Sequence, residues 1–307
     1  MLKSLTVFAT VSLALLTICF APSVSNAGDF AVPVVGTPDT VRICTWNLHN
    51  YNVARRNVNG KWRVHPKPES ERDAICDVLA KINPDILLVQ EIGDSGFMND
   101  FRARLEKRGL RFAFCAVGER KVSSRLGILS KIKPEKVFDF SDAQFEMDGI
   151  QKASPRGTLG FKFKGASKEW FVFCVHLKSK FGAKKADGEF AALRYAEASA
   201  LCSRIRGVCP DSSPLIVGGD MNDVPENSKL IEAFAMNFLR PLPQRDSSGA
   251  DFTYLWAKKN LRFKYDLFFV NYSASNILDG ITAVVFDGEN RSECDHRPVY
   301  IDFPMPR

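Results

Sequence analysis

The sequence predicts an α+β protein in which helices cover the outer faces of β-sheets. Short apolar runs typical of buried strands recur along the whole chain, and two or three longer segments show apolar residues at helical spacing. The 307 residues can bury a large core, and a composition of 45% hydrophobic and 25% charged residues is ordinary for a globular protein. With no repeat and no linker evident, we expect one domain at residues 41–305, after a lead at residues 28–40.

Two strands are predicted in the first part of this domain. Residues 42–46 form an apolar run that ends in Asn47, and residues 85–90 form a second run that delivers Glu91. Runs of this kind are typical of strands that are buried on both faces.

The segment between these strands has the pattern of a helix. Residues 70–73 (Ser-Glu-Arg-Asp) have the form of a capping box, and Asn83 and Pro84 stop the helix. The apolar residues at helical spacing are Ile75, Val78, Leu79 and Ile82.

A second helix is predicted at residues 188–205, with Gly207 and Pro210 ending it. Its apolar side consists of Phe190, Leu193, Leu201 and Ile205. The remaining predicted strands are residues 127–130, 158–163, 170–177, 214–217, 267–270 and 299–303.

Residues 1–27 have the pattern of a secretory signal peptide. Lys3 gives a short basic start, a mostly apolar stretch follows, and Ser-Asn-Ala ends at Ala27 with small residues where a signal peptidase reads. Cleavage there would release an exported protein, periplasmic or secreted. A membrane anchor is an alternative, but the apolar run is short of the roughly 20 residues that span a bilayer. Lipid attachment at Cys19 is another, disfavoured by the bulky Ile18 before it.

The charge and the cysteines of the mature chain are only weakly informative. The formal charge of +7 becomes +6 without residues 1–27, whose only charged residue is Lys3. A mild positive excess suits an anionic substrate. Seven of the eight cysteines remain, so at least one is free unless it pairs between chains. Cys202 and Cys209 flank a helix end and could pair in an oxidising compartment. No Cys/His spacing typical of zinc sites is present.

Polar residues stand at one end of several apolar runs. If the last two strands run antiparallel to the others, all of these residues lie along one edge of the sheets. Each has an ordinary alternative, since Asp and Asn are common turn residues and a histidine in an apolar run is usually a core residue. Together they indicate one cleft. The residues are Asn47, Glu91, His176, Asp220 and Asn222 after their runs, and Asp266, Asp295 and His296 before theirs.

Three of these residues suit a metal site. Glu91 and Asp295 supply hard oxygen ligands of the kind that bind magnesium, manganese or calcium, ions that also take a substrate phosphate. Asn47 can hold a phosphate oxygen or orient Glu91. A divalent cation is therefore the expected cofactor.

The other residues suit acid–base chemistry. Asp220 and Asn222, two positions apart on a strand, can hold an attacking water or a phosphoryl oxygen from one face. His296 is the candidate general base because an imidazole titrates near neutral pH, and Asp266 is the best candidate to fix its tautomer.

Six motifs together resemble the endonuclease/exonuclease/phosphatase superfamily, the relatives of pancreatic-type deoxyribonuclease. The resemblance extends from about Val41 to Phe303 and implies a four-layer α/β/β/α sandwich of two mixed sheets flanked by helices. It also implies divalent-metal phosphoester hydrolysis, with Mg²⁺ as the first choice and Mn²⁺ or Ca²⁺ as alternatives. The motifs are ICTWNLHN, ILLVQEI, FCVHLKS, GGDMND, KYDLFFV and CDHRPV.

The resemblance implies roles for single residues. It places Asn47 and Glu91 in the metal site, makes His176 the acid used by nuclease members, and makes Arg156, in SPRGTLGFKF, a phosphate contact. Cys294 stands where members often have a serine that is not the nucleophile, so we expect little loss. The matches to the Asp-x-Asn pair, the supporting aspartate and the terminal Asp-His pair are Asp220 and Asn222, Asp266, and Asp295 and His296.

Two basic segments favour a polyanionic substrate, although either alone could be a solvated loop. Lys and Arg contacts to phosphates supply most non-specific affinity for nucleic acids. We therefore favour an exported, monomeric nuclease of low sequence specificity acting on DNA, with RNA as an alternative, and take Lys178 as a phosphate contact. The segments contain Arg55, Arg56, Lys61, Trp62, Arg63 and Lys67, and Lys178, Lys180, Lys184 and Lys185.

Two other functions are alternatives. A phosphodiesterase or phosphatase acting on lipid headgroups, like a sphingomyelinase, or on small phosphate esters would use the same metal site. A lipid enzyme should expose an apolar hairpin, and none is clear in the sequence. A binding protein without activity is disfavoured because no candidate catalytic position is substituted.

Overall fold

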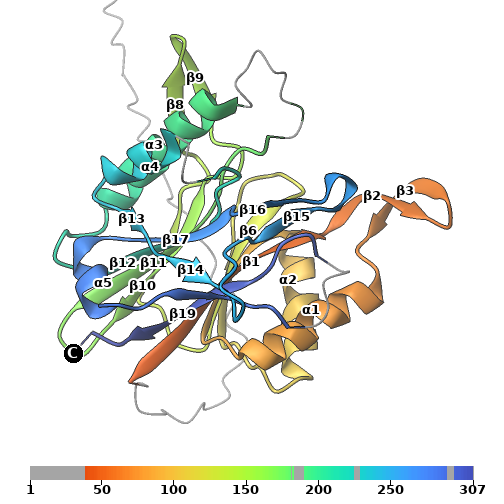
Figure 1. The fold of residues 1–307 in the computed structure, drawn as a ribbon, viewed down its shortest axis with the longest axis horizontal. Coiled ribbons are helices and arrows are strands. Elements are labelled where there is room, and N and C mark those ends of the chain that lie inside the picture. Colours follow the sequence, from red (N-terminus) through yellow and green to blue (C-terminus); the bar gives the residue numbers. More distant parts are fainter. Residues whose placement is uncertain (1–38, 181, 183–189, 225–228, 289–293, 307) are drawn as a thin grey trace, which may run out of the picture.

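The computed structural model describes residues 39–180, 182, 190–224, 229–288 and 294–306. Over these residues, two large mixed sheets pack face to face and helices cover their outer faces (Figure 1). The predicted α/β/β/α sandwich is therefore confirmed. The predicted signal peptide, residues 1–27, lies outside the described residues.

The first sheet has seven strands within the described chain, in the order β14-β18-β19-β1-β4-β6-β5. β1 and β4 run parallel, and β19 runs antiparallel to β1. The strands are β1 (Thr40–Tyr51), β4 (Ile86–Ile92), β5 (Phe114–Val117), β6 (Arg125–Ser130), β14 (Gln244–Arg245), β18 (Ala283–Val285) and β19 (Val299–Pro304).

The second sheet has six strands within the same residues, in the order β13-β17-β12-β11-β10-β7. β11 and β12 run parallel, and β17 runs antiparallel to β12. The two late strands with polar residues at their starts, β17 and β19, thus run antiparallel to β12 and β1. The prediction that all the polar residues lie along one edge of the sheets requires this direction. The strands are β7 (Lys136–Asp139), β10 (Thr158–Lys164), β11 (Glu169–His176), β12 (Leu215–Asp220), β13 (Arg240–Pro241) and β17 (Asp266–Val270).

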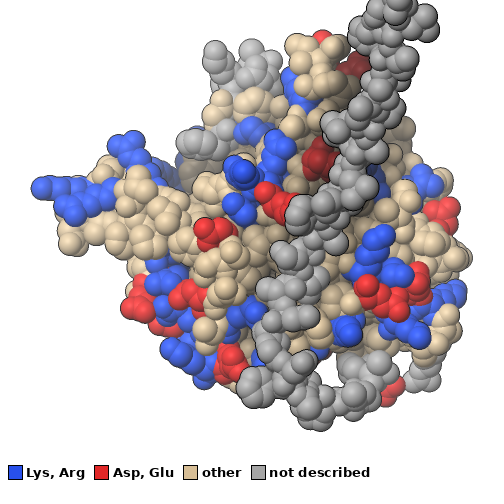
Figure 2. Space-filling view, turned by 180° about the vertical axis from the view of Figure 1, so that it is seen from behind, with Lys and Arg blue, Asp and Glu red and all other residues tan. Residues whose placement is uncertain are grey.

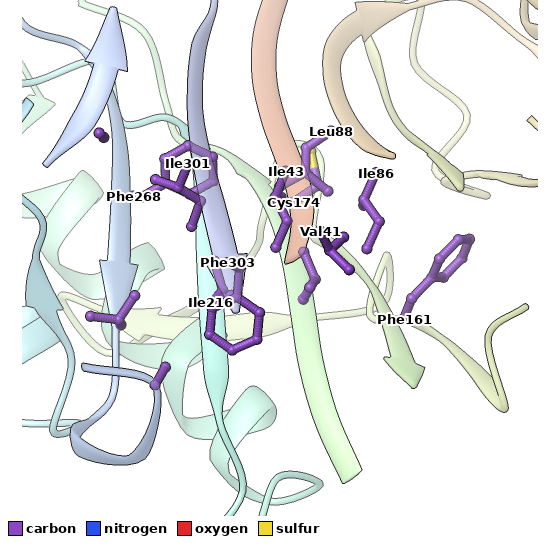
Figure 3. Close-up of a cluster of buried hydrophobic side chains, with 14 of the residues drawn as sticks. Val41, Ile43, Ile86, Leu88, Phe161, Cys174, Ile216, Phe268, Ile301 and Phe303 are labelled. Atoms are coloured by element: carbon purple, nitrogen blue, oxygen red, sulfur yellow. The ribbon is translucent and has the colours of Figure 1, made fainter. Parts of the chain in front are cut away.

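The two sheets bury an apolar core between them (Figure 3). Ile43 and Leu88, from β1 and β4, share this core with Phe161, Ile216 and Phe268 from the second sheet, and each is at most 1% exposed. Burying an aliphatic or aromatic side chain of this size stabilises a fold by about 1.5–3 kcal/mol. The core therefore holds the two sheets rigidly together behind their polar edge.

Helices α1 (Glu69–Ile82) and α2 (Ser95–Glu106) cover the first sheet. α1 ends as predicted, with Asn83 in the left-handed conformation. The predicted capping box at residues 70–73 is wrong, because the helix already begins at Glu69 and the amide of Arg72 donates to the Pro68 carbonyl.

Helices α3 (Ala191–Arg206) and α4 (Lys229–Ala235) cover the second sheet. The predicted apolar side of α3 is half wrong. Leu201 and Ile205 are buried, but Phe190 precedes the helix with φ 61° and Leu193 is only partly buried. The buried face of α3 consists of Arg194, Glu197, Ala198, Leu201, Cys202 and Ile205.

Three hairpins and two short helices complete the described fold. The β2–β3 hairpin projects from the body at the same side of the molecule as the β15–β16 hairpin (Figure 1). These elements are β2 (Val53–Val58), β3 (Lys61–Pro66), β8 (Gln144–Met147), β9 (Ile150–Ala153), β15 (Tyr254–Trp256), β16 (Leu261–Phe263), α5 (Tyr272–Ile277) and the 3-10 helix η3 (Ala257–Lys259). No helix of the described residues is long and apolar enough to cross a membrane.

The seven cysteines from Cys44 onward form no disulfide with one another among the described residues, and six of them are buried. The pairing considered for Cys202 and Cys209 is not formed, since Cys202 packs in the core under α3 and the Cys209 thiol donates to the Pro210 carbonyl. Burial raises the pKa of Cys174 to about 12.

Candidate active site

Asp220, the last residue of β12, is the centre of a buried polar cluster. Its carboxylate accepts hydrogen bonds from Asn47 Nδ2 at 3.0 Å, from the Asn222 amide at 2.8 Å and from Asn222 Nδ2 at 3.1 Å. Nε2 of His176 lies 3.4 Å and Nε2 of His296 lies 3.8 Å from the same carboxylate. The structure therefore brings together five of the residues predicted from the strand ends.

The glycine before Asp220 allows this close approach. Gly219 pairs with Val175 and has φ +154°, and a Cβ there would overlap the Val175 carbonyl oxygen. Only glycine fits without a shift of one strand. The tight pairing places Asp220 directly beside His176 on β11.

His296 is held by Asp266. Its Nδ1 lies 2.7 Å from Asp266 Oδ2, the backbone carbonyl of His296 accepts from Trp46 Nε1 at 3.1 Å, and its ring lies 4.8 Å from the Tyr254 ring. Burial alone would lower the pKa of His296, but the carboxylates of Asp266 and Asp220 outweigh it and raise the pKa to about 10.

The pKa values of His176 and Asp220 are shifted in opposite directions. Burial, and then the charges of Arg156, His296 and Lys178, put the pKa of His176 well below its usual value. His176 is therefore neutral near pH 7. Burial raises the pKa of Asp220, and the charge of Asp266 raises it further against the opposing effect of His296.

Glu91 and Asp295, the two other predicted metal ligands, are each linked to the segment that follows Asn47. Glu91 Oε2 accepts from the Asn50 amide at 2.8 Å, while Asp295 Oδ1 is buried without a hydrogen-bond partner among the described residues and lies 3.6 Å from His49 Nδ1. Asn47 and both carboxylates contact the same segment, residues 49–50, and an orphaned carboxylate oxygen with such neighbours fits a hard divalent cation. Ligand atoms of Asp220, Asp266 and His296, within 4.8 Å of one another, are a second group that could hold a metal.

The hydroxyl of Tyr254 lies within the electrostatic influence of three of the site carboxylates, Asp295, Asp220 and Glu91. Burial raises the pKa of this hydroxyl, and the charges of Asp295, Asp220 and Glu91 raise it further, in that order. All three carboxylates therefore act on one hydroxyl, although they come from three different strands or strand ends.

Backbone strain is concentrated around the same groups. His49, Asn50, Glu91 and Asn222 all have positive φ, between 48° and 63°. Glu91 lies at a register shift between β4 and β6. Such conformations cost non-glycine residues on the order of 1–3 kcal/mol each and are typical of functional sites.

Arg156 and Lys178, the two predicted phosphate contacts, lie close to His176. Arg156 Nη1 donates to the Leu177 carbonyl at 3.4 Å, and Lys178 Nζ lies 4.4 Å from the centre of the Phe190 ring. The charges of both lower the pKa of His176. The structure thus puts two cations next to a neutral imidazole.

The basic segments are only partly available to a substrate. Lys67 is 1% exposed, donates to the His49 carbonyl and pairs with Glu71 at 3.1 Å, so its predicted part in polyanion binding is wrong. Arg56 donates to backbone carbonyls at the base of the hairpin, and Lys180 pairs with Asp223 at 3.1 Å. Lys184 and Lys185 lie outside the described residues.

Four residues around the site were not predicted from the sequence. Trp46 and Tyr254 contact His296, and no local pattern distinguishes them from core aromatics. Arg194 and Glu197 could have been recognised from the sequence by their position on the helix. Both are charged, yet they share a helix face with buried Leu201.

The comparisons identify relatives of the chain by sequence and by fold. A family model described as the Endonuclease/Exonuclease/phosphatase family matches residues 44–275. No match to a curated protein was found.

Three solved structures are similar along almost their whole length. A mutant beta toxin from Staphylococcus aureus with bound magnesium ions has a TM-score of 0.64 and 14% identity, covering 86% of this chain and 99% of that one. Sphingomyelinase C from Streptomyces griseocarneus has a TM-score of 0.63 and 16% identity, covering 87% and 100%. The human Nocturnin catalytic domain with a bound sulfate anion has a TM-score of 0.60 and 16% identity, covering 89% and 97%. At these identities the likeness shows a shared fold.

Proposed function

This chain belongs to the endonuclease/exonuclease/phosphatase family of phosphoesterases, and we propose that it is an exported, divalent-metal-dependent nuclease of low sequence specificity. The observation that carries this proposal is the cluster around Asp220, in which two imidazoles of opposite pKa shift face one carboxylate. DNA is the substrate we favour, with RNA as the alternative.

In the proposed reaction, Asp220 and His296 bind the attacking water. Their facing atoms are 3.8 Å apart, too far for a direct hydrogen bond, so both can point at one water. His296 Nε2 takes the proton, and Asp266 stabilises the imidazolium that forms because its carboxylate bonds Nδ1 at 2.7 Å. Asn222 keeps the Asp220 carboxylate in place.

Asn47, Glu91 and Asp295 are the residues that would hold the metal, and a divalent cation bound there supplies Lewis-acid stabilisation of the phosphoryl charge. Its positive charge would also oppose the carboxylates that raise the pKa of His296, leaving the ring able to accept a proton near pH 7. We assign the Asp220–Asp266–His296 group to proton transfer and not to metal binding. The hydrogen bond between His296 Nδ1 and Asp266 Oδ2 already occupies one possible ligand atom of each of these two residues.

Arg156, Lys178 and His176 would bind the phosphoryl group next to Asp220. A neutral His176 can donate its ring N–H to a phosphoryl oxygen or to the leaving oxygen. The two cations would balance the charge of the diester, as Lys and Arg commonly do at phosphate sites.

The β2–β3 hairpin supports a polymeric substrate. In the strand register, Arg56, Lys61 and Arg63 share one face, and Figure 2 shows Lys and Arg gathered on this projecting part of the molecule. Arg56 donates to the Asn50 carbonyl, and the Asn50 amide donates to Glu91, so this basic face begins at the candidate metal site. A phosphate backbone leaving the site could follow it.

The opposite face of the same hairpin keeps the lipid alternative open. It carries Val64, which is 75% exposed, and Trp62, which is 63% exposed. An exposed apolar hairpin was expected of a lipid enzyme and was not evident in the sequence. A sphingomyelinase-like phosphodiesterase is therefore the second candidate function.

One panel of substrates tests both functions. The mature chain would be incubated with plasmid DNA, RNA, sphingomyelin vesicles and bis-p-nitrophenyl phosphate, with Mg²⁺ or with chelator. We expect cleavage of DNA. A Lys61→Gln/Arg63→Gln variant should cleave DNA more slowly and with a salt slope smaller by roughly two, while the small diester is unaffected. Hydrolysis of vesicles alone, weakened by Trp62→Ala instead, would establish the lipid function and overturn the nuclease.

A further inference from the structure

A buried carboxylate lies beneath both of the cationic segments that flank His176. Glu197, on the inner face of α3, is 0% exposed. Its Oε1 accepts a hydrogen bond from Ser154 Oγ at 2.7 Å, and its Oε2 accepts one from the Lys178 amide at 2.9 Å. One side chain is thus bonded to two segments that are more than twenty residues apart in the sequence.

The bond to Ser154 fixes the segment that carries Arg156. Ser154 Oγ also accepts from the Gly157 amide at 3.0 Å, so one hydroxyl closes the turn around Arg156 and bonds that turn to Glu197. Gly157 has φ +68°, and a Cβ there would overlap the Phe140 backbone, so the turn has little freedom to shift.

The bond to Lys178 fixes the other segment directly behind His176. Arg194, which lies next to Glu197 on the buried face of α3, donates to the Lys178 carbonyl at 3.2 Å and pairs with Asp223 at 2.9 Å. The backbone of Lys178 is therefore held on both sides from one helix face.

The hydrogen bonds between Glu197 and both segments oppose the electrostatic repulsion between Arg156 and Lys178. Arg156 Nη1 donates to the carbonyl of Leu177, the residue before Lys178, so the two cations lie near each other. Burial lowers the pKa of Lys178, and the charge of Arg156 lowers it further. Like charges at short range repel, and unanchored segments would move apart. Burial also raises the pKa of Glu197, against the hydrogen bonds from Ser154 and Lys178. The fold thus keeps a carboxylate in an unfavourable, fully buried position where it is bonded to both of the segments that carry these cations.

We propose that Glu197 is a positioning residue that holds Arg156 and Lys178 together as one phosphate-binding unit beside His176. The proposal rests on the phosphodiesterase function, but it makes a separate claim about anion affinity. Glu197 does not touch the substrate, and it acts only through the two cations.

The experiment measures binding of inorganic phosphate to the metal-free protein by calorimetry, and KM and kcat for bis-p-nitrophenyl phosphate with Mg²⁺. Glu197→Ala should weaken phosphate binding and raise KM roughly tenfold or more, the scale of a lost hydrogen bond to a charged group, with a smaller change in kcat. Glu197→Gln should stay near wild type, because an amide can accept from the Lys178 amide and donate to Ser154 Oγ.

Two further variants separate positioning from stability. Cys202→Ala removes buried atoms from the same helix face, so it should lower the melting temperature without changing phosphate affinity. Ser154→Ala removes one of the two bonds to Glu197 and should weaken phosphate binding even if Glu197→Ala fails to fold.

The outcomes distinguish the two proposals. A wild-type protein that binds phosphate but hydrolyses no diester would overturn the proposed function, and the phosphate affinities would still test Glu197. Wild-type phosphate affinity in folded Glu197→Ala, or in Ser154→Ala, would overturn the positioning role. So would an additional loss from Glu197→Ala in an Arg156→Gln/Lys178→Gln background, where nothing is left to position.

Discussion

An Asp266→Asn substitution would change which nitrogen of His296 carries the proton while keeping the shape of the side chain. In the native site, Asp266 Oδ2 accepts the Nδ1 proton at 2.7 Å, so Nε2 faces Asp220 and can accept a proton. Asp266 Oδ1 is buried with no hydrogen-bond partner among the described residues. An amide NH₂ left at that position would be unsatisfied, at a cost of about 1–3 kcal/mol. The amide should therefore donate to Nδ1 and force the ring proton onto Nε2.

The expected loss follows from the role of the base. General-base assistance contributes about 10²–10⁴-fold to a rate, which corresponds to roughly 2.7–5.4 kcal/mol of transition-state stabilisation. We expect kcat to fall by that factor on both DNA and bis-p-nitrophenyl phosphate, because activation of the water is common to both substrates. His296→Ala should lose about as much, and the double variant little more, since the two residues act as one unit.

Rates with saturating Mg²⁺, circular dichroism melts and long-range ¹H–¹⁵N correlation spectra of the histidine ring would check this reasoning. The spectra report directly which ring nitrogen is protonated. Wild-type kcat in a folded Asp266→Asn protein whose His296 proton has moved to Nε2 would refute the assignment of His296 as the general base.

Three further predictions concern the metal, the second histidine and the sheet that carries Asp220. Chelator should abolish hydrolysis and Mg²⁺ or Mn²⁺ should restore it, with Glu91→Gln raising the metal concentration for half-maximal rate; full activity after exhaustive chelation would contradict the metal site. His176→Ala should slow DNA cleavage by about 10²–10³-fold but nitrophenyl ester hydrolysis much less, because nitrophenolate needs less stabilisation by a hydrogen-bond donor than a sugar alkoxide does; equal losses would mean that His176 binds the phosphoryl oxygen instead. Gly219→Ala should destabilise the fold by about 1–3 kcal/mol in chemical denaturation, and an unchanged midpoint would show that β11 and β12 can separate without cost.

The sheets and the site edge could be predicted because they depend on local patterns. Apolar runs located β1, β4, β11, β12, β17 and β19, and the polar residues at their ends then converge by strand direction alone. Helix α2 was also readable, since Asp94 caps it and Met98, Phe101 and Leu105 follow at helical spacing, but it was missed.

Other features depend on contacts between distant segments and leave no local pattern. Lys67 lies in a segment with the composition of a basic loop. It is nevertheless buried, because its ammonium group donates to the His49 carbonyl and pairs with Glu71. The β2–β3 hairpin has no regular alternation of apolar and polar residues, since both of its faces are exposed to solvent over most of its length. Glu197 could be recognised only as a charge on an apolar helix face.

The seven cysteines from Cys44 onward link the folding of this chain to its redox surroundings. While the protein is folded, six of them are buried and protected from oxidants, and burial raises the pKa of Cys174 to about 12, which keeps that thiol protonated. Unfolding exposes all seven at once, and their pKa returns to the ordinary range, where thiolates form disulfides readily. Among the described residues, no native disulfide exists to guide their pairing. Thermal unfolding should therefore be reversible with reductant present and irreversible in air. In air the unfolding rate, more than the equilibrium free energy, then sets the lifetime of the folded enzyme.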